Sequence, residues 1–240
     1  MTDRLRVTLI PASVRTAFSD LVDPVADWLI RWRVQPNAIT VVSAVVLLGS
    51  GAAFGAGFPR LGGFWLLISG LLDMLDGKVA RRSGMTTTFG AFFDSTLDRL
   101  GEAVLFAGIA IFFVTTSGQR WPILGLGVSL LTLAGAFLVS YTRARAEGLG
   151  MECKVGIAQR PERIIGLGVP TLIFGAGPHG WLLLVLMALL AVANTITVIQ
   201  RVAHVHRLTA SGAPETTDAL APPPPPPSSS SFVDPVVKGH

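Results

Sequence analysis

The stretch DMLDGKVARRSGMTTTFGAFFDSTLD, residues 73–98, places four aspartates at the edges of two apolar segments. Asp73 and Asp76 lie in the tail of the first segment, and Asp94 and Asp98 lie at the start of the second. Residues three or four apart share a face of a helix, so each pair presents two carboxylates on one side. The connecting loop, about 81–89, is short enough to force an antiparallel helix pair. We therefore expect the two carboxylate pairs to converge between the helices.

The rest of the chain has the composition of a membrane protein. Half of its 240 residues are hydrophobic and 14% are charged, whereas soluble domains carry about 25% charged residues. Six apolar runs are long enough to cross a bilayer, or nearly so: roughly 38–57, 63–79, 91–116, 121–142, 164–178 and 181–200. Six such runs with short connections disfavour a soluble helical protein. The predicted fold is all-α and integral to the membrane, with six transmembrane helices.

The distribution of positive charge predicts the orientation. Lys and Arg are concentrated before the first run, between runs two and three, between runs four and five, and after run six, while the opposite loops hold only Arg60 and Arg120. Basic residues favour the cytoplasmic side. Both termini and the four aspartates are therefore expected on the cytoplasmic side of the cytoplasmic membrane. Basic residues there also meet anionic lipid headgroups, so the charge implies no nucleic-acid partner.

Two segments flank the predicted spans. Residues 13–33 combine apolar residues at helical spacing with Trp28 and Trp32, which is typical of an amphipathic helix lying on the membrane surface. Residues 209–240 are rich in Pro and Ser and are expected to be a disordered tail. The expected membrane domain is residues 1–208, with the spans within about 38–205.

The four aspartates need compensation for their charge. An ionised Asp inside a span costs roughly 2.5–3.5 kcal/mol, so four cost on the order of 10 kcal/mol. One divalent cation or two, Mg²⁺ or Mn²⁺, would offset this cost, because hard ions prefer oxygen ligands. Salt bridges to Arg81, Arg82 and Arg99 are the structural alternative. An ion or metal transporter is the alternative of another class; acids at the cytoplasmic edge and the lack of repeated halves argue against it.

Small residues beside the aspartates suggest room for a ligand. Gly77 and Gly90 have no side chain, so a bulky ligand can reach the backbone there, and Ala80 is small. Arg81 can neutralise a phosphate from the same face. Close helix packing is the other explanation for the glycines, and both can hold together.

These positions resemble the signature of the CDP-alcohol phosphotransferases, which exchange the CMP of a CDP-linked lipid for an incoming alcohol in phospholipid biosynthesis. The matching pattern is Asp73-x-x-Asp76-Gly77-x-x-Ala80-Arg81, eight residues, then Gly90-x-x-x-Asp94-x-x-x-Asp98. The resemblance covers about residues 20–205. It implies a transferase, a homodimer, and CDP-diacylglycerol as donor.

The resemblance also implies a role for each position. Asp73, Asp76 and Asp94 would hold metal on the pyrophosphate, and Asp98 would join the metal site and deprotonate the acceptor hydroxyl. Positions bordering the nucleotide would be Gly77, Ala80, Arg81 and Gly90, and Asp73 would contact the CDP as well as the metal. The sequence PNAIT resembles the family's entry to span one, which adds Asn37 and Thr40 as CDP contacts, with helix capping as their alternative role. The intact aspartates argue against a catalytically inactive lipid-binding relative.

The acceptor is predicted from the loop after span four. It concentrates five cationic residues, which suit a phosphate on the acceptor: Arg143, Arg145, Lys154, Arg160 and Arg163. Positive-inside charge without a substrate role is the alternative. The segment SYTRARAE…RPERII resembles the phosphatidylinositol phosphate synthase branch of the family, which implies inositol phosphate as acceptor. Glycerol phosphate, which would give phosphatidylglycerophosphate, is the second candidate.

Overall fold

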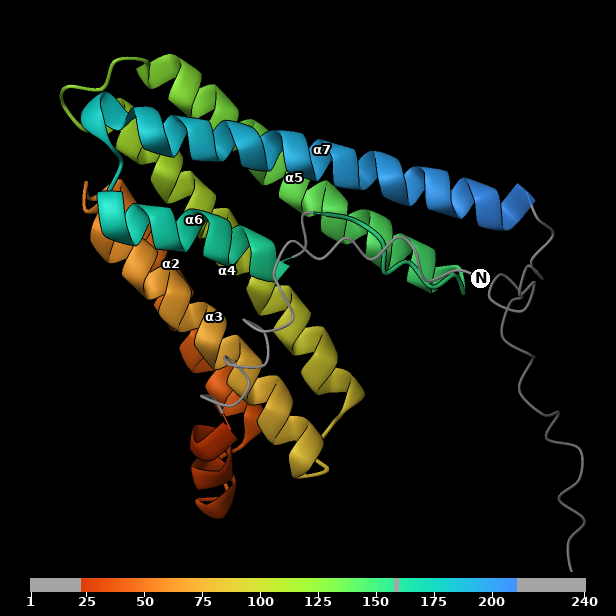
Figure 1. Ribbon diagram of the computed structural model, residues 1–240. Helices are drawn as coiled ribbons and strands as arrows, with labels where there is room; N and C mark the ends of the chain where they lie inside the picture. Colours follow the sequence, from red (N-terminus) through yellow and green to blue (C-terminus); the bar gives the residue numbers. More distant parts are fainter. Residues whose placement is uncertain (1–22, 158–159, 211–240) are drawn as a thin grey trace, which may run out of the picture.

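The computed structural model describes residues 23–157 and 160–210, and every regular element within them is helical (Figure 1). Residues 23–31 form a short helix. The longer elements are α2 (Pro36–Gly55), α3 (Pro59–Arg82), α4 (Thr88–Thr115), α5 (Pro122–Gly148), α6 (Arg160–Phe174) and α7 (Trp181–Ala210), with the 3₁₀ turn η1 (Pro178–Gly180) before α7. The all-α prediction is confirmed.

The six long helices pack as a closed ring. Each helix packs mainly against two others, in the order α2, α3, α6, α7, α5, α4 and back to α2. The long helices α5 and α7 lie side by side, and α6 lies against α3 (Figure 1). This arrangement brings α2, α3 and α4 together, so the segments that carry the aspartates share a neighbour in α2.

Helix boundaries follow from local sequence. Proline occupies the first turn of α2, α3 and α5, where its missing N–H costs nothing. Thr87 caps α4 by accepting a hydrogen bond of 2.9 Å from the Gly90 backbone N–H. The fifth apolar run predicts a helix at 164–178, but α6 runs from Arg160 to Phe174. It ends there because Gly175 and Gly177 adopt positive φ values of 65° and 72°, which leave the helical conformation.

The crossing of α2 and α4 depends on two glycines. A Cβ on Gly51 would lie 2.5 Å from the backbone oxygen of Val104, and one on Gly108 would lie 2.0 Å from the backbone oxygen of Gly51. Only residues without side chains allow helix backbones to approach so closely. Gly51 and Gly108 therefore serve the packing of α2 against α4 within the chain.

The interior combines apolar side chains with hydroxyl groups that bond to neighbouring helices. The largest fully buried apolar side chains are Phe54, Leu66, Ile109, Leu167, Leu183, Met187 and Val79. Ser50 on α2 donates to the Gly62 carbonyl of α3 at 2.7 Å, and Thr132 on α5 donates to the Met187 carbonyl of α7 at 2.9 Å. Small hydroxyl residues that bond across helices are typical of membrane bundles.

Within the described residues, three helical segments are long and apolar enough to cross a membrane: Pro36–Gly55, Pro122–Gly148 and Pro178–Ala210. The other three helices of the ring, α3, α4 and α6, do not meet these criteria of length and apolar composition. Charged residues interrupt the apolar stretches of α3 and α4, and α6 has only 15 residues. The chain is thus a helical membrane protein.

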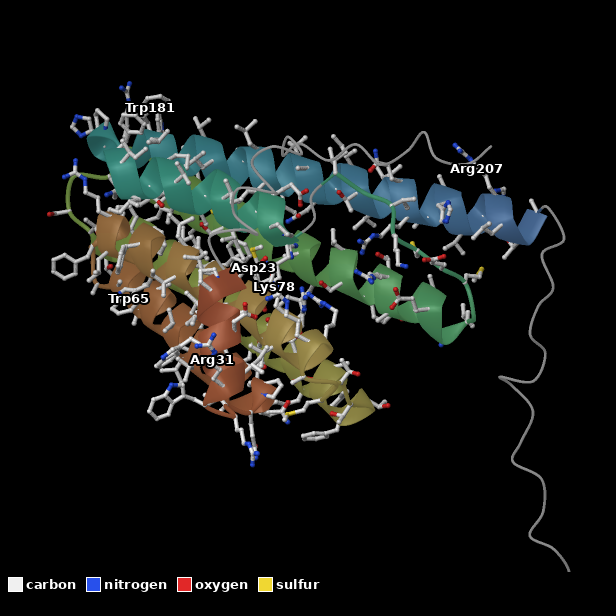
Figure 2. All side chains as sticks on the ribbon, turned by 60° about the horizontal axis from the view of Figure 1, so that its bottom comes forward. Asp23, Arg31, Trp65, Lys78, Trp181 and Arg207 are labelled. Carbon is white, nitrogen blue, oxygen red and sulfur yellow. The ribbon has the colours of Figure 1, made fainter. Side chains whose placement is uncertain are left out.

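The short helix 23–31 docks on the end of α3. Lys78 on α3 donates to Asp23 at 2.6 Å, and Figure 2 shows these two side chains side by side. This hydrogen bond holds the pKa of Asp23 below its ordinary value. Ala26 is fully buried in an apolar cluster with Leu75 and Val79 of α3. Trp28 and Trp32 are exposed, as expected for a surface helix. Residues 13–22 of the predicted helix and residues 211–240 of the predicted tail lie outside the described residues, whereas Thr209 and Ala210, the first two residues of that tail, belong to α7.

Candidate active site

The end of α3 and the start of α4 bring three of the four aspartates together. Each of Asp73, Asp76 and Asp94 offers a carboxylate oxygen, and the three oxygens all lie within 4.8 Å of one another. Residues 83–87 connect the two helices, which places the Asp76 and Asp94 faces opposite each other. The convergence expected from the spacing is present for these three residues.

The cluster of these three carboxylates fits a hard divalent cation. Asp76 is 6% exposed and accepts a hydrogen bond of 2.8 Å from Thr40. The Oδ1 atom of Asp94 is buried and has no hydrogen-bond partner. A buried, unpartnered carboxylate oxygen is costly unless a ligand or ion completes it. Three oxygen ligands on one side of a small space are a donor set for Mg²⁺ or Mn²⁺.

The fourth aspartate has a different partner. Asp98 accepts from Arg160 at 2.5 Å and lies 3.9 Å from Arg99. The other end of the same Arg160 guanidinium donates to Asp73, also at 2.5 Å. Asp98 thus joins the triad through an arginine of α6, and its carboxylate is not part of the compact oxygen group. The alternative of interhelical salt bridges is not formed by Arg82, which pairs with Asp23 and Asp27. The contact of Arg99 with Asp98 joins neighbouring residues within α4 and does not link two helices.

A pocket of about 170 Å³ opens beside the triad. Its walls include six of the seven residues expected to contact the nucleotide, together with Asp76 and Asp94: Asn37, Thr40, Gly77, Ala80, Arg81 and Gly90. The seventh, Asp73, is not among the residues that line this pocket. A Cβ on Gly90 would lie 2.9 Å from the Thr87 hydroxyl and 3.2 Å from Asn37 Oδ1. Glycine at position 90 therefore keeps both the helix cap and the pocket wall clear.

A larger cavity of about 760 Å³ lies far from the aspartates and the pocket beside them. It is bounded by the turns at residues 57–61, 117–119 and 174–180, which join the opposite ends of the helices. The aspartates lie at the other end of α3 and α4, so this cavity is separate from the candidate active site.

The five cationic residues of the α5–α6 region divide into two groups. Arg143 and Arg145 near the end of α5 are exposed, as is Lys154. Arg143 pairs with Glu147 at 2.8 Å, and Lys154 pairs with Glu152. These three residues do not contact the aspartates.

Arg160 and Arg163 form the second group, at the start of α6. Arg160 is mostly buried and bridges two aspartates. Arg163 is 6% exposed and donates to Glu102 at 2.6 Å, while its Nε and Nη1 atoms are buried without a hydrogen-bond partner. The structure thus brings these two arginines to the carboxylates and leaves the other three cations at the surface.

Sequence reasoning missed Glu102. This buried residue accepts from Arg163 on α6 and, at 2.8 Å, from Arg99 on its own helix. Arg99 also donates to the Ser140 hydroxyl of α5, so Glu102 and Arg99 together link α4, α5 and α6. The sequence spacing indicates this position, because Glu102 follows Asp98 by four residues and therefore shares its helix face.

Arg201 was also missed, having been counted only as a charge after the last span. It is 5% exposed on α7. Its Nε donates to the Val155 carbonyl at 3.0 Å, and its Nη1 donates to the Val139 carbonyl. His204 contacts the Glu152 carbonyl at 3.2 Å. Together these contacts hold residues 151–157 against α7, near the start of α6.

Comparison with known proteins agrees with this geometry. The chain is 39% identical to the archaetidylinositol phosphate synthase of Methanothermobacter thermautotrophicus over 80% of its own length and 91% of that protein. It is 38% identical to the phosphatidylinositol phosphate synthase of Mycolicibacterium smegmatis, over 84% and 90% of the two chains.

Solved structures give the same relationship. Two crystal structures of the phosphatidylinositol phosphate synthase of Mycobacterium tuberculosis, one with manganese and citrate and one with CDP-DAG bound, each match with a TM-score of 0.67 and 33% identity. They cover 77% and 78% of this chain, and 88% and 94% of their own chains. The family described as CDP-alcohol phosphatidyltransferase matches residues 33–205. The chain belongs to the CDP-alcohol phosphatidyltransferase family.

Proposed function

We propose that this protein transfers the phosphatidyl group of CDP-diacylglycerol to inositol phosphate and releases CMP. The observation that carries this proposal is the group of Asp73, Asp76 and Asp94 oxygens within 4.8 Å, beside a pocket lined by the family's nucleotide positions. Mg²⁺ is commonly held by carboxylates together with substrate phosphates. An acidic triad next to a small polar pocket is thus suited to a pyrophosphate-bearing donor.

The donor would be held by α2, α3 and α4. Asn37 and Thr40 on α2 face Arg81 and Gly77 of α3 across the pocket, where the nucleotide would bind. Arg81 lies over Gly77, with its Nη1 3.1 Å from the place of a Cβ there, and its charge suits a phosphate. The metal, Mg²⁺ or Mn²⁺ and in our proposal two ions, would offset charge on the phosphoryl oxygens.

The acceptor assignment rests on two supports. The relatives above differ in the lipid part of their names but share inositol phosphate. Arg160 lies beside the aspartates and contacts Asp98. An acceptor whose phosphate binds there would have its hydroxyl group close to Asp98. Arg143, Arg145, Lys154 and Arg163 complete the proposed acceptor region, the first three from the surface and Arg163 through its pair with Glu102.

The proposed reaction is an exchange at the phosphatidyl phosphorus. The hydroxyl oxygen of the acceptor forms a bond to this phosphorus, and the bond from the phosphorus to the oxygen that leaves with CMP breaks. The hydroxyl proton passes to the carboxylate of Asp98, which would act as general base. Asp98 is 14% exposed and lies between Arg160 and Arg99, so these arginines would orient it.

We further propose that all six helices α2–α7 cross the cytoplasmic membrane, with the termini and the carboxylates on the cytoplasmic side. The positions of the basic residues support this orientation. Residues up to about 208 would form the membrane domain and the remainder a disordered tail. A homodimer is proposed from the family resemblance alone.

Purified protein should be assayed with CDP-diacylglycerol and a panel of acceptors: inositol phosphate, inositol, glycerol phosphate and serine. Inositol phosphate should give the fastest CMP release. Arg160→Ala should raise the KM for inositol phosphate about 10- to 150-fold, the worth of a charge-assisted contact, and leave that for CDP-diacylglycerol nearly unchanged. A preference for glycerol phosphate or an unphosphorylated alcohol would refute the acceptor assignment, and no CMP release with any acceptor would refute the transferase.

A further inference from the structure

Arg160 contacts the carboxylates in a way that a simple acceptor-binding role does not require. Its Nη1 pairs with Asp73 Oδ1 and its Nη2 with Asp98 Oδ1, both at 2.5 Å. One guanidinium from α6 thus joins α3 to α4, and its side chain is only 14% exposed. Asp73 is also one of the three carboxylates of the compact oxygen group.

We propose that Arg160 competes with the divalent cation for these carboxylates, and that metal binding releases Arg160 to the phosphate of the acceptor. This inference rests on the proposed function. It assigns to one residue both the control of metal affinity and the order in which metal and acceptor bind.

Electrostatics support the competition. A guanidinium and a divalent cation that share Asp73 would be like charges a few ångströms apart in a poorly hydrated site, where repulsion is strong. The cluster holds five carboxylates, those of Asp73, Asp76, Asp94, Asp98 and Glu102. Three of its cations are the guanidiniums of Arg99, Arg160 and Arg163. Arg81 lines the pocket beside Asp76 and Asp94 as a fourth cation, so one negative charge is in excess when all these groups are ionised. One divalent cation turns this excess into a net positive charge, which favours the release of Arg160 toward an anionic phosphate.

The neighbouring arginines have other anchors. Arg163 pairs with Glu102, and Arg99 pairs with Glu102 and Ser140. Both ion pairs of Arg160 in the described part of the chain go to Asp73 and Asp98. Arg160 is thus the arginine whose release would leave the links between α4, α5 and α6 in place. Metal and acceptor phosphate would then bind cooperatively, each strengthening the other by the same factor.

The test measures Mn²⁺ binding without substrate, by following the free Mn²⁺ signal in electron paramagnetic resonance. Arg160→Gln removes the charge and keeps a polar side chain, and it should bind Mn²⁺ roughly tenfold more tightly than wild type. Arg160→Lys keeps the charge and should bind close to wild type. Arg120→Gln is the matched control, because Arg120 is exposed and lies over the Trp121 ring, before α5 and away from the aspartates; its Mn²⁺ affinity should not change.

Unchanged affinity in Arg160→Gln would mean that Arg160 serves the phosphate alone, and weaker affinity would mean that it only supports the carboxylates; either result overturns the proposal. Asp76→Asn should lose binding, which shows that the signal reports this site. If wild type binds no Mn²⁺, both this inference and the metal-dependent function fail. If wild type binds Mn²⁺ and only the increase is missing, the proposed function stands and the inference falls.

Discussion

The hydroxyl of Thr40 on α2 donates a 2.8 Å hydrogen bond to the Oδ2 atom of Asp76 on α3. Both residues are buried, so α2 orients a carboxylate of the triad from outside the motif that carries it. A hydrogen bond to a charged group is worth about 1.5–3 kcal/mol. Thr40→Val should therefore raise the Mg²⁺ concentration for half-maximal activity by about 10-fold or more.

Thr40→Ser retains the hydroxyl and is the control for this change. It should stay within about threefold of wild type, since 0.6 kcal/mol is a factor of about three. If valine and serine behave alike in a metal titration of CMP release, Thr40 does not orient Asp76 for metal binding.

Removal of the divalent metal should abolish activity. Without it, nothing offsets the mutual repulsion of Asp73, Asp76 and Asp94 and the charge of a bound pyrophosphate. EDTA should stop CMP release, and excess Mg²⁺ or Mn²⁺ should restore it. Asp76→Asn should be inactive at all metal concentrations while eluting as a folded protein in detergent. Full turnover in excess chelator would contradict the metal site.

The location of the site was predictable because its signals are local. The spacing of Asp73 and Asp76 gives them a shared face of one helix, and the short connection to the next helix predicts that Asp94 lies opposite them. The pocket residues lie within the same motif or at the start of α2. Helix ends were less predictable: α5 continues to Gly148, beyond the expected end near 142. The segment TRARAEG leaves the apolar run but is rich in good helix formers, so hydropathy alone underestimates the helix.

The ion pairs of α6 were not predictable from spacing. Arg160 meets Asp73 across 87 residues, and Arg163 meets Glu102 across 61. These pairings exist only because α6 packs on α3 and its arginines reach α4. A count of positive charges in the α5–α6 region gave no reason to separate Arg160 and Arg163 from Arg143, Arg145 and Lys154.

Loss of the Asp98 carboxylate should slow the chemical step. If Asp98 accepts the hydroxyl proton of the acceptor, Asp98→Asn should lower kcat by about 10²–10⁴-fold, which is typical of general-base loss. The KM for CDP-diacylglycerol should change little, because the pocket walls do not include Asp98. Steady-state kinetics at saturating metal separates the two constants. Near-normal kcat in the variant would exclude a proton-transfer role.

The docking of helix 23–31 should depend on pH through Asp23. Lys78 holds the pKa of Asp23 below its ordinary value, so this group stabilises the folded state above its unfolded pKa of about 3.9. The contribution is lost as pH falls through the lowered folded value. The thermal midpoint of Asp23→Asn should therefore lie below that of wild type at pH 7, and the difference should shrink in acid below about pH 4. If the thermal midpoints of wild type and Asp23→Asn differ equally at pH 7 and in acid, the ion pair between Asp23 and Lys78 is not the cause of the difference.

Glu102 should contribute more to stability than any surface acid, because it pairs with two arginines in the interior. Breaking a buried pair by removing one partner costs about 3–5 kcal/mol, since the remaining charge stays buried. Glu102→Gln leaves Arg163 at 6% exposure without an opposing charge from this position. Its thermal midpoint in detergent should fall by several degrees. Glu147→Gln is the matched control, because Glu147 pairs with Arg143 at the surface, where such pairs are worth about 0–1 kcal/mol. Equal midpoints for the two variants would show that the Glu102 cluster does not hold α6 against α4, and the orientation of Arg160 would then need another cause.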